Sequence, residues 1–109
     1  MFGDLGRMMR IAADMKRKMP QVQAKLEAAE FDAEAGGGTV RAIVNGKLRL
    51  VDVEIDPELL ADRQLDAGLL EDLIRAAVSA AQKKAADAAA RAMEELTGGL
   101  SIPGIEGLM

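Results

Sequence analysis

The feature that most constrains the fold is an apolar stripe through the first 29 residues. Its members are spaced alternately by three and four, so they lie along one side of a helix for more than three heptads. The stripe consists of Leu5, Met8, Ala12, Met15, Met19, Val22, Leu26 and Ala29. We predict a helix of about 26 residues, ~39 Å long at ~1.5 Å per residue, and therefore expect part of it to project from a small domain.

The sequence does not determine which surface packs against this stripe. The stripe could be a dimer seam, could pack on the chain's own sheet, or could bind a partner helix. Methionines at helical spacing are more often ordinary core residues, so burial is the default interpretation.

Two helix breakers divide this part of the chain. Pro20 lacks a backbone donor and crowds the carbonyl of Lys16, which predicts a kink or break between residues 16 and 20. The helix is expected to end before Gly36-Gly37-Gly38, a run that we interpret as a hinge-like connector.

A β-hairpin is predicted after the glycine run. Thr39 to Val44 and Leu48 to Ile55 are rich in Val, Ile and Leu, and Asn45-Gly46 separates them. Asn-Gly favours a type I′ turn, in which both central residues have positive φ. The alternation of apolar residues is interrupted near Leu50-Val51, which predicts a bulge there.

A short helical turn and a second long helix complete the expected fold. Asp56 is a candidate N-cap with Pro57 at the first helical position. The long helix runs from about Asp66, a second candidate cap, to Thr97 before Gly98-Gly99. Its predicted apolar face consists of Leu70, Leu73, Ile74, Ala77, Val78 and Ala81, extended by Met93 and Leu96. The fold class is therefore α+β, with two or three antiparallel strands between long N-terminal and C-terminal helices. The 109 residues suit one domain.

Charge is segregated along the chain. Residues 1–25 carry six basic side chains against two acidic ones, whereas residues 52–72 carry eight acidic side chains against Arg63. The six cations all fall off the apolar stripe, and they are Arg7, Arg10, Lys16, Arg17, Lys18 and Lys25. This pattern is typical of a basic arm on an acidic body, although the net charge is -4.

Composition excludes most catalytic and metal chemistry. The chain has no Cys and no His, so it lacks thiolate nucleophiles and the most common general base and transition-metal ligand. Asp52, Glu54 and Asp56 alternate on a strand, and we interpret them as a solvated face in preference to a magnesium site. We predict no enzymatic activity, no cofactor, no metal, no small-molecule substrate and no membrane span.

The ordered string of short motifs resembles the YbaB/EbfC family of bacterial nucleoid-associated proteins. The likeness covers nearly the whole chain. It rests on the opening Met1-Phe2-Gly3, the Met-rich first helix, Val44-Asn45-Gly46, the segment from Val53 to Leu60, the helix opening from Leu70 to Ile74, and the segment from Leu96 to Leu100 followed by Ile102-Pro103-Gly104.

This resemblance implies a cytoplasmic, nucleoid-located homodimer with helices that project like tweezer arms and bind double-stranded DNA with weak sequence preference. Such a protein would bridge or compact DNA and influence gene expression. The domain would span residues 1–100, with a flexible tail over residues 101–109. In this chain the resemblance assigns DNA contact to Arg7, Arg10, Lys16, Arg17, Lys18 and Lys25, with Lys83, Lys84 and Arg91 as weaker candidates.

Two other interpretations of the same residues stay open. The cations could be only the solvated face of a coiled coil. The net charge of -4 and the Met-rich stripe would also fit a protein-interaction module or adaptor whose helical arms bind a partner polypeptide.

Overall fold

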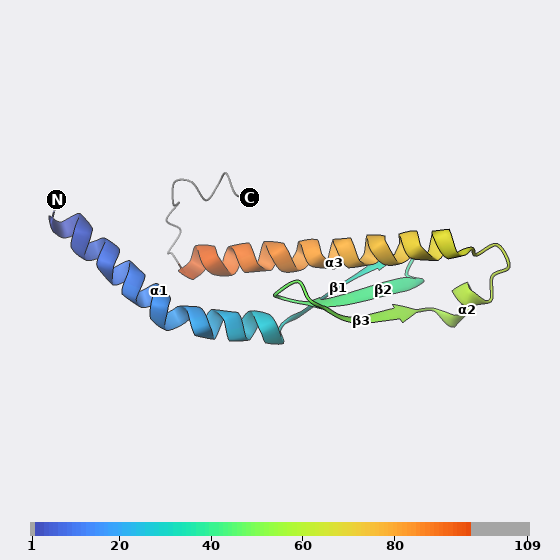
Figure 1. Cartoon of the computed structure of the whole chain (residues 1–109), viewed down its shortest axis with the longest axis horizontal. Coiled ribbons are helices and arrows are strands. Elements are labelled where there is room, and N and C mark those ends of the chain that lie inside the picture. Colours follow the sequence, from blue (N-terminus) through green and yellow to red (C-terminus); the bar gives the residue numbers. More distant parts are fainter. Residues whose placement is uncertain (1, 97–109) are drawn as a thin grey trace.

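The chain folds as a small antiparallel sheet flanked by long helices, in a computed structural model that describes residues 2–96. The elements are α1 (Phe2–Ala28), β1 (Glu30–Ala35), β2 (Val40–Asn45), β3 (Leu50–Ile55), α2 (Pro57–Leu60) and α3 (Ala67–Leu96). Figure 1 shows α3 lying along the sheet while α1 runs away from it. The α+β class and the two long helices are confirmed. The tail at residues 101–109 and the helix end at Gly98-Gly99 lie outside the described residues.

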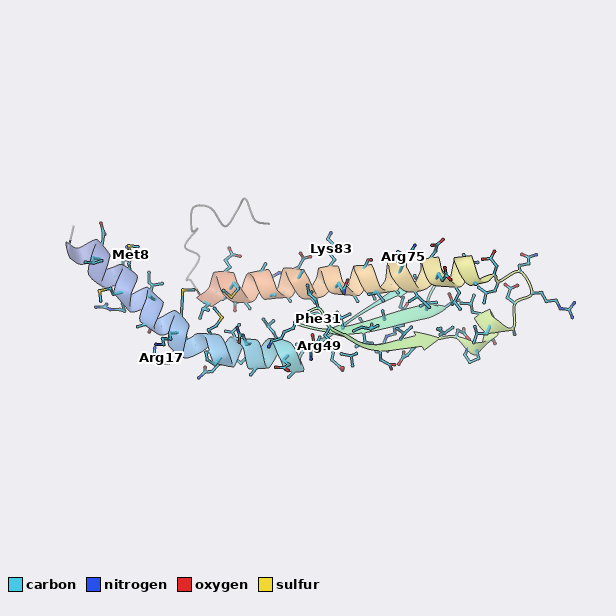
Figure 2. All side chains as sticks on the ribbon, viewed as in Figure 1. Met8, Arg17, Phe31, Arg49, Arg75 and Lys83 are labelled. Atoms are coloured by element: carbon cyan, nitrogen blue, oxygen red, sulfur yellow. The ribbon has the colours of Figure 1, made fainter. Side chains whose placement is uncertain are left out.

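The molecule is elongated because α1 extends away from the sheet and does not pack along it. Its extents are 71 × 26 × 16 Å and its radius of gyration is 19.5 Å, whereas a compact chain of this length has a radius of about 13 Å. The helix changes direction near Arg17 (Figures 1 and 2) but remains helical through Pro20. The predicted kink is therefore confirmed, and so is the projection of the helix.

The core is thin and built from small residues. Val40, Ala42 and Val44 of β2 are completely buried against three α3 alanines, Ala77, Ala81 and Ala85. Alanines spaced by four present a narrow surface, so α3 can approach β1 and β2 closely. Leu70, Leu73, Ile74 and Val78 pack around this core, as the sequence predicts.

The third strand, β1, completes the antiparallel sheet, for which the sequence predicted two or three strands without assigning residues 30–35 to one of them. Phe31, Ala33 and Ala35 face the core side, while Glu30, Asp32 and Glu34 are exposed. The period of two is present in the sequence, but alanine and glutamate favour helices and mask it. Pairing with β2, from Glu30 opposite Asn45 to Ala35 opposite Val40, decides the outcome.

The glycine run connects β1 to β2 as a tight β-turn, whereas the sequence placed this connector between the first helix and the hairpin. Gly36, Gly37 and Gly38 have φ values of 62°, 69° and 91°, which residues other than glycine rarely adopt. Thr39 Oγ1 donates a hydrogen bond of 2.8 Å to the Gly36 carbonyl and closes the turn. The run therefore fixes the β1–β2 hairpin.

The β2–β3 connection also differs from the predicted type I′ turn. Leu48, and neither Asn45 nor Gly46, has positive φ (68°). The Leu48 N–H donates to the Asn45 carbonyl at 3.0 Å, and Asn45 Oδ1 accepts bonds from the N–H groups of Lys47 and Arg49. This is a three-residue hairpin loop, which is the common alternative to the two-residue turn. The bulge is confirmed, because Val44 pairs with Leu50 while Ile43 pairs with Asp52.

Both predicted N-caps are confirmed. Asp56 Oδ1 accepts a bond of 3.0 Å from the Glu58 N–H, with Pro57 in the first turn of α2. Asp66 Oδ1 accepts a bond of 2.7 Å from the Leu69 N–H at the start of α3. These caps fix where the chain turns back to lay α3 over the sheet.

Candidate nucleic-acid interface

The six candidate cations are all exposed, and they follow α1 from its free end to the sheet. Arg7 and Arg10 lie on the arm, by which we mean residues 2–16, the part of α1 before the bend. Arg17 lies at the bend (Figure 2). From Arg7 to Lys25 the helix rises about 27 Å at ~1.5 Å per residue, which corresponds to about eight base pairs of duplex DNA.

The cations do not form one row. Arg7 and Arg10 are three residues apart and share a side of the helix. Lys18 and Lys25 line an open cavity of about 320 Å³ between α1 and the end of α3, which Glu95 also lines. Lys16 belongs to the side of the apolar stripe, because it is four residues from Ala12. The structure therefore does not bring all six cations to one surface.

One of the six cations is partly neutralised. Arg17 Nη2 forms an ion pair of 2.7 Å with Asp14 Oδ1 on the same helix. Asp14 is also four residues from both Arg10 and Lys18, so its carboxylate lies at the centre of the cationic side.

Of the weaker candidates on α3, Lys84 has a structural role. Its Nζ donates a hydrogen bond of 2.7 Å to the backbone carbonyl of Asp32 on β1. Lys83 and Arg91 are exposed, and Figure 2 shows Lys83 pointing away from the sheet.

Sequence reasoning missed two cations beside the last turn of α1. The Gly46 N–H donates to the Leu26 carbonyl at 2.7 Å, which joins the β2–β3 loop to the end of α1. This contact brings Arg49 and Lys47, both exposed, to the same end of the helix, and Lys47 pairs with Glu27 at 3.5 Å. The sequence carries no local signal for this juxtaposition, since about 20 residues separate the two segments.

The sheet face opposite α3 is acidic. Arg41 lies between Asp32 and Glu54, with its Nε 3.0 Å from Asp32 Oδ2 and its Nη1 2.8 Å from Glu54 Oε2. The hydrogen bond from Arg41 and its positive charge lower the pKa of Asp32. The bond to Glu54, followed by the bond to Asp32, raises the pKa of Arg41. The lowered pKa of Asp32 favours its charged form, and a face lined by carboxylates is unsuited to a polyanion.

The described residues offer little support for other kinds of site. Within residues 2–96 there is no group of three or more His, Cys, Asp or Glu side chains placed to hold a metal ion. A search of the same residues for a helix with the length and hydropathy of a membrane span finds none.

Comparison with known proteins places this architecture in a family. The sequence profile of the YbaB/EbfC DNA-binding family matches residues 1–100. The chain belongs to the YbaB/EbfC DNA-binding family. The resemblance stated from the motifs is therefore confirmed.

Relatives of this family support the assignment over nearly the whole chain. A nucleoid-associated protein of Clostridium kluyveri is 40% identical over 103 residues, which are 94% of this chain and 89% of that protein. A nucleoid-associated protein of Pelotomaculum thermopropionicum is 39% identical over 105 residues, 96% of this chain and 98% of that protein. The crystal structure of an uncharacterized protein from Helicobacter pylori matches with a TM-score of 0.55 at 27% identity, covering 67% of this chain and 82% of that one.

Proposed function

We propose that this YbaB/EbfC-family protein is a nucleoid-associated protein that binds double-stranded DNA as a homodimer, chiefly through electrostatic contacts of α1. The observation that carries the proposal is the exposure of all six cations on a helix that projects from an acidic body. Each cation that neutralises a phosphate releases counterions, and two arms in a dimer double the number of contacts. The proposal includes bridging or compaction of DNA, with an influence on gene expression, and no enzymatic activity.

Weak sequence preference follows from the side chains available. The chain has no Trp or Tyr, and Phe31 packs against the core. Phe31 is therefore not available to stack on bases, and no element within residues 2–96 resembles a recognition helix set for base edges. Phosphate contacts position a protein on DNA without reading its sequence.

The test is binding to a random-sequence duplex over a salt series. We expect binding near 50 mM salt and a linear fall of log K with log salt, at about 0.9 per phosphate contact. Absence of binding near 50 mM salt, or binding that is insensitive to salt, would contradict the proposal.

The two edges of the sheet differ in what covers them, and this difference supports a homodimer. On the β1 edge, Lys84 already bonds the Asp32 carbonyl. The β3 edge lies away from α3, which packs on β1 and β2, and no strand lies beyond it in the described part of the chain. Val51 on β3 is 52% exposed and Leu50 is 46% exposed. An open edge with apolar side chains is a template for a second strand, so we place the dimer contact along β3.

Substituting Val51→Lys is expected to weaken the dimer at least 10-fold. Val51 is already exposed in the single chain, so the lysine leaves the protomer folded but buries a charge at the proposed contact. Analytical ultracentrifugation over a concentration series measures the change. The control is Ala86→Lys, which places the same side chain at an exposed position of α3. An unchanged dimer constant for Val51→Lys would remove β3 from the interface.

Substituting Asp14→Asn is expected to raise DNA affinity about 2- to 5-fold. The change frees Arg17 from its 2.7 Å ion pair and removes a negative charge from the cationic side of α1. The salt dependence should steepen by about one contact per arm. The matched control is Asp72→Asn, because Asp72 forms the equivalent pair with Arg75 at 2.9 Å on α3. Equal effects of the two variants would show that only net charge matters.

A further inference from the structure

The arm carries an apolar surface that nothing in the described chain covers. Leu5, Met8 and Met9 are 58%, 67% and 65% exposed. Together with Ala12, also exposed, they form what we call the arm face. Single exposed apolar side chains are common, but three large ones within five residues of a helix form a patch.

The arm face continues a stripe that is already used for helix packing. Beyond the bend, Val22 and Leu26 are half-buried and share a cavity with Ala92 and Leu96 of α3. Figure 1 shows the end of α3 beside the part of α1 that follows the bend, so within residues 2–96 the stripe continues beyond the end of α3. The arm face therefore has the character of a helix-pairing surface without its helix.

The arm face and the arginines of the arm point in opposite directions. At about 100° per residue, the mean direction of the arm face lies roughly 180° from that of Arg7 and Arg10. A duplex held by these arginines therefore leaves the arm face uncovered. Contact between the arm face and the same duplex is disfavoured for the same reason.

We propose that the arm face pairs with the arm face of a second copy from a neighbouring dimer, and that this contact links dimers bound to DNA. The proposal rests on the proposed DNA-binding function and adds a second surface to it. In an antiparallel pairing, Leu5 of one copy would meet Ala12 of the other, and Met8 would meet Met9. Large side chains opposite small ones interdigitate, which makes the patch complementary to itself.

Size and charge make this contact dependent on DNA. Four side chains per copy bury far less than the ~800 Å² per partner of a stable interface. Residues 2–18 also carry five cations and two acids, so free arms repel each other. DNA neutralises the cations and holds copies side by side at high effective concentration.

Cross-linking tests the contact directly, since the chain has no cysteine of its own. A Met8→Cys variant, treated with a short thiol cross-linker, should give at least 5-fold more two-chain product on a duplex long enough for several dimers than on a duplex that fits one. The control is Lys83→Cys, at an exposed position on α3, which should show no such increase. Equal cross-linking of Met8→Cys on both duplexes would overturn the link between dimers.

A second variant measures the energetic contribution of the arm face. The double variant Leu5→Gln, Met8→Gln keeps good helix formers but removes the apolar surface. We expect affinity for the short duplex within 2-fold of the parent, and cooperativity on the long duplex reduced at least 5-fold. Met93→Gln, which alters an exposed methionine of α3, is the control.

The outcomes separate the inference from the proposed function. Failure of the parent protein to bind any duplex overturns the proposed function. Normal binding with unchanged cooperativity in the double variant overturns only the arm contact. Loss of short-duplex affinity in the double variant would overturn the arm contact and assign the arm face to DNA. If Met8→Cys cross-links to a foreign protein in the absence of DNA, and never to a second copy, the arm face binds a partner polypeptide and the proposal is overturned.

Discussion

Substituting Arg7→Gln together with Arg10→Gln is expected to weaken duplex binding at least 30-fold near 0.1 M salt. Both side chains are exposed on the arm, far from the acidic face of the sheet. If both contact phosphates in each arm of a dimer, four contacts are lost, and the slope of log K against log salt falls by about 4. Fluorescence anisotropy with a labelled duplex over a salt series gives both quantities.

The matched control removes the same charge from a part of the molecule away from the arm. Arg63 and Arg75 are also exposed, and Figure 2 shows Arg75 on the part of α3 that lies over the sheet, well away from the arm. We expect Arg63→Gln together with Arg75→Gln to change the affinity by less than 3-fold and the slope by less than 1. If the two double variants weaken binding equally, the arm is not the DNA-binding surface.

Substituting Gly46→Ala is expected to cause the largest loss of stability among single glycine substitutions, about 1–3 kcal/mol of unfolding free energy. An added Cβ would lie 2.8 Å from both the C and Cα atoms of Leu26, and these backbone atoms cannot move without moving α1. The 2.7 Å bond from the Gly46 N–H to the Leu26 carbonyl would be strained or lost. Urea denaturation followed by circular dichroism measures the change.

The control for this substitution is Gly6→Ala in the arm. No atom lies within 4 Å of the Cβ that alanine would add there, and alanine favours helix more than glycine does. We expect a gain of up to about 1 kcal/mol in local helix stability. A Gly46→Ala variant as stable as the parent protein would show that α1 is not tightly joined to the loop.

Local sequence signals predicted those features of the fold that neighbouring residues determine. In the caps of α2 and α3, an aspartate side chain accepts a hydrogen bond from a backbone N–H that is at most three residues further along the chain. The bend in α1 follows from Pro20, and the bulge follows from interrupted alternation at Leu50-Val51. Each of these depends on fewer than ten residues of contiguous chain.

Features that depend on distant partners were missed or wrong. Residues 30–35 form a strand because they pair with β2 and pack under α3, which outweighs the helix propensity of their alanines and glutamates. Gly46 is needed for the close approach of Leu26 and does not have the positive φ that its Asn-Gly context suggested. The wrong turn type came from assigning a local cause to Gly46, whose role is a tertiary contact.

The candidate site divides in the same way. The sequence identified the six cations and placed them off the apolar stripe, which holds for five of them, whereas Lys16 lies on the side of the stripe. It could not reveal that Lys84 bonds a carbonyl of β1 or that Arg49 lies near the end of α1. These facts depend on how α3 and the hairpin loop are docked.

The sequence by itself therefore determined the two long helices, the caps of α2 and α3, the family and the basic character of α1, since residue order fixes periodicity and charge. Only the tertiary structure decided that α3 ends beside the bend of α1, and hence that Val22 and Leu26 are half-buried next to α3 while Leu5, Met8 and Met9 stay exposed. The physical reason is that burial depends on what lies opposite a side chain. A stripe of uniform spacing is covered only where another element reaches it.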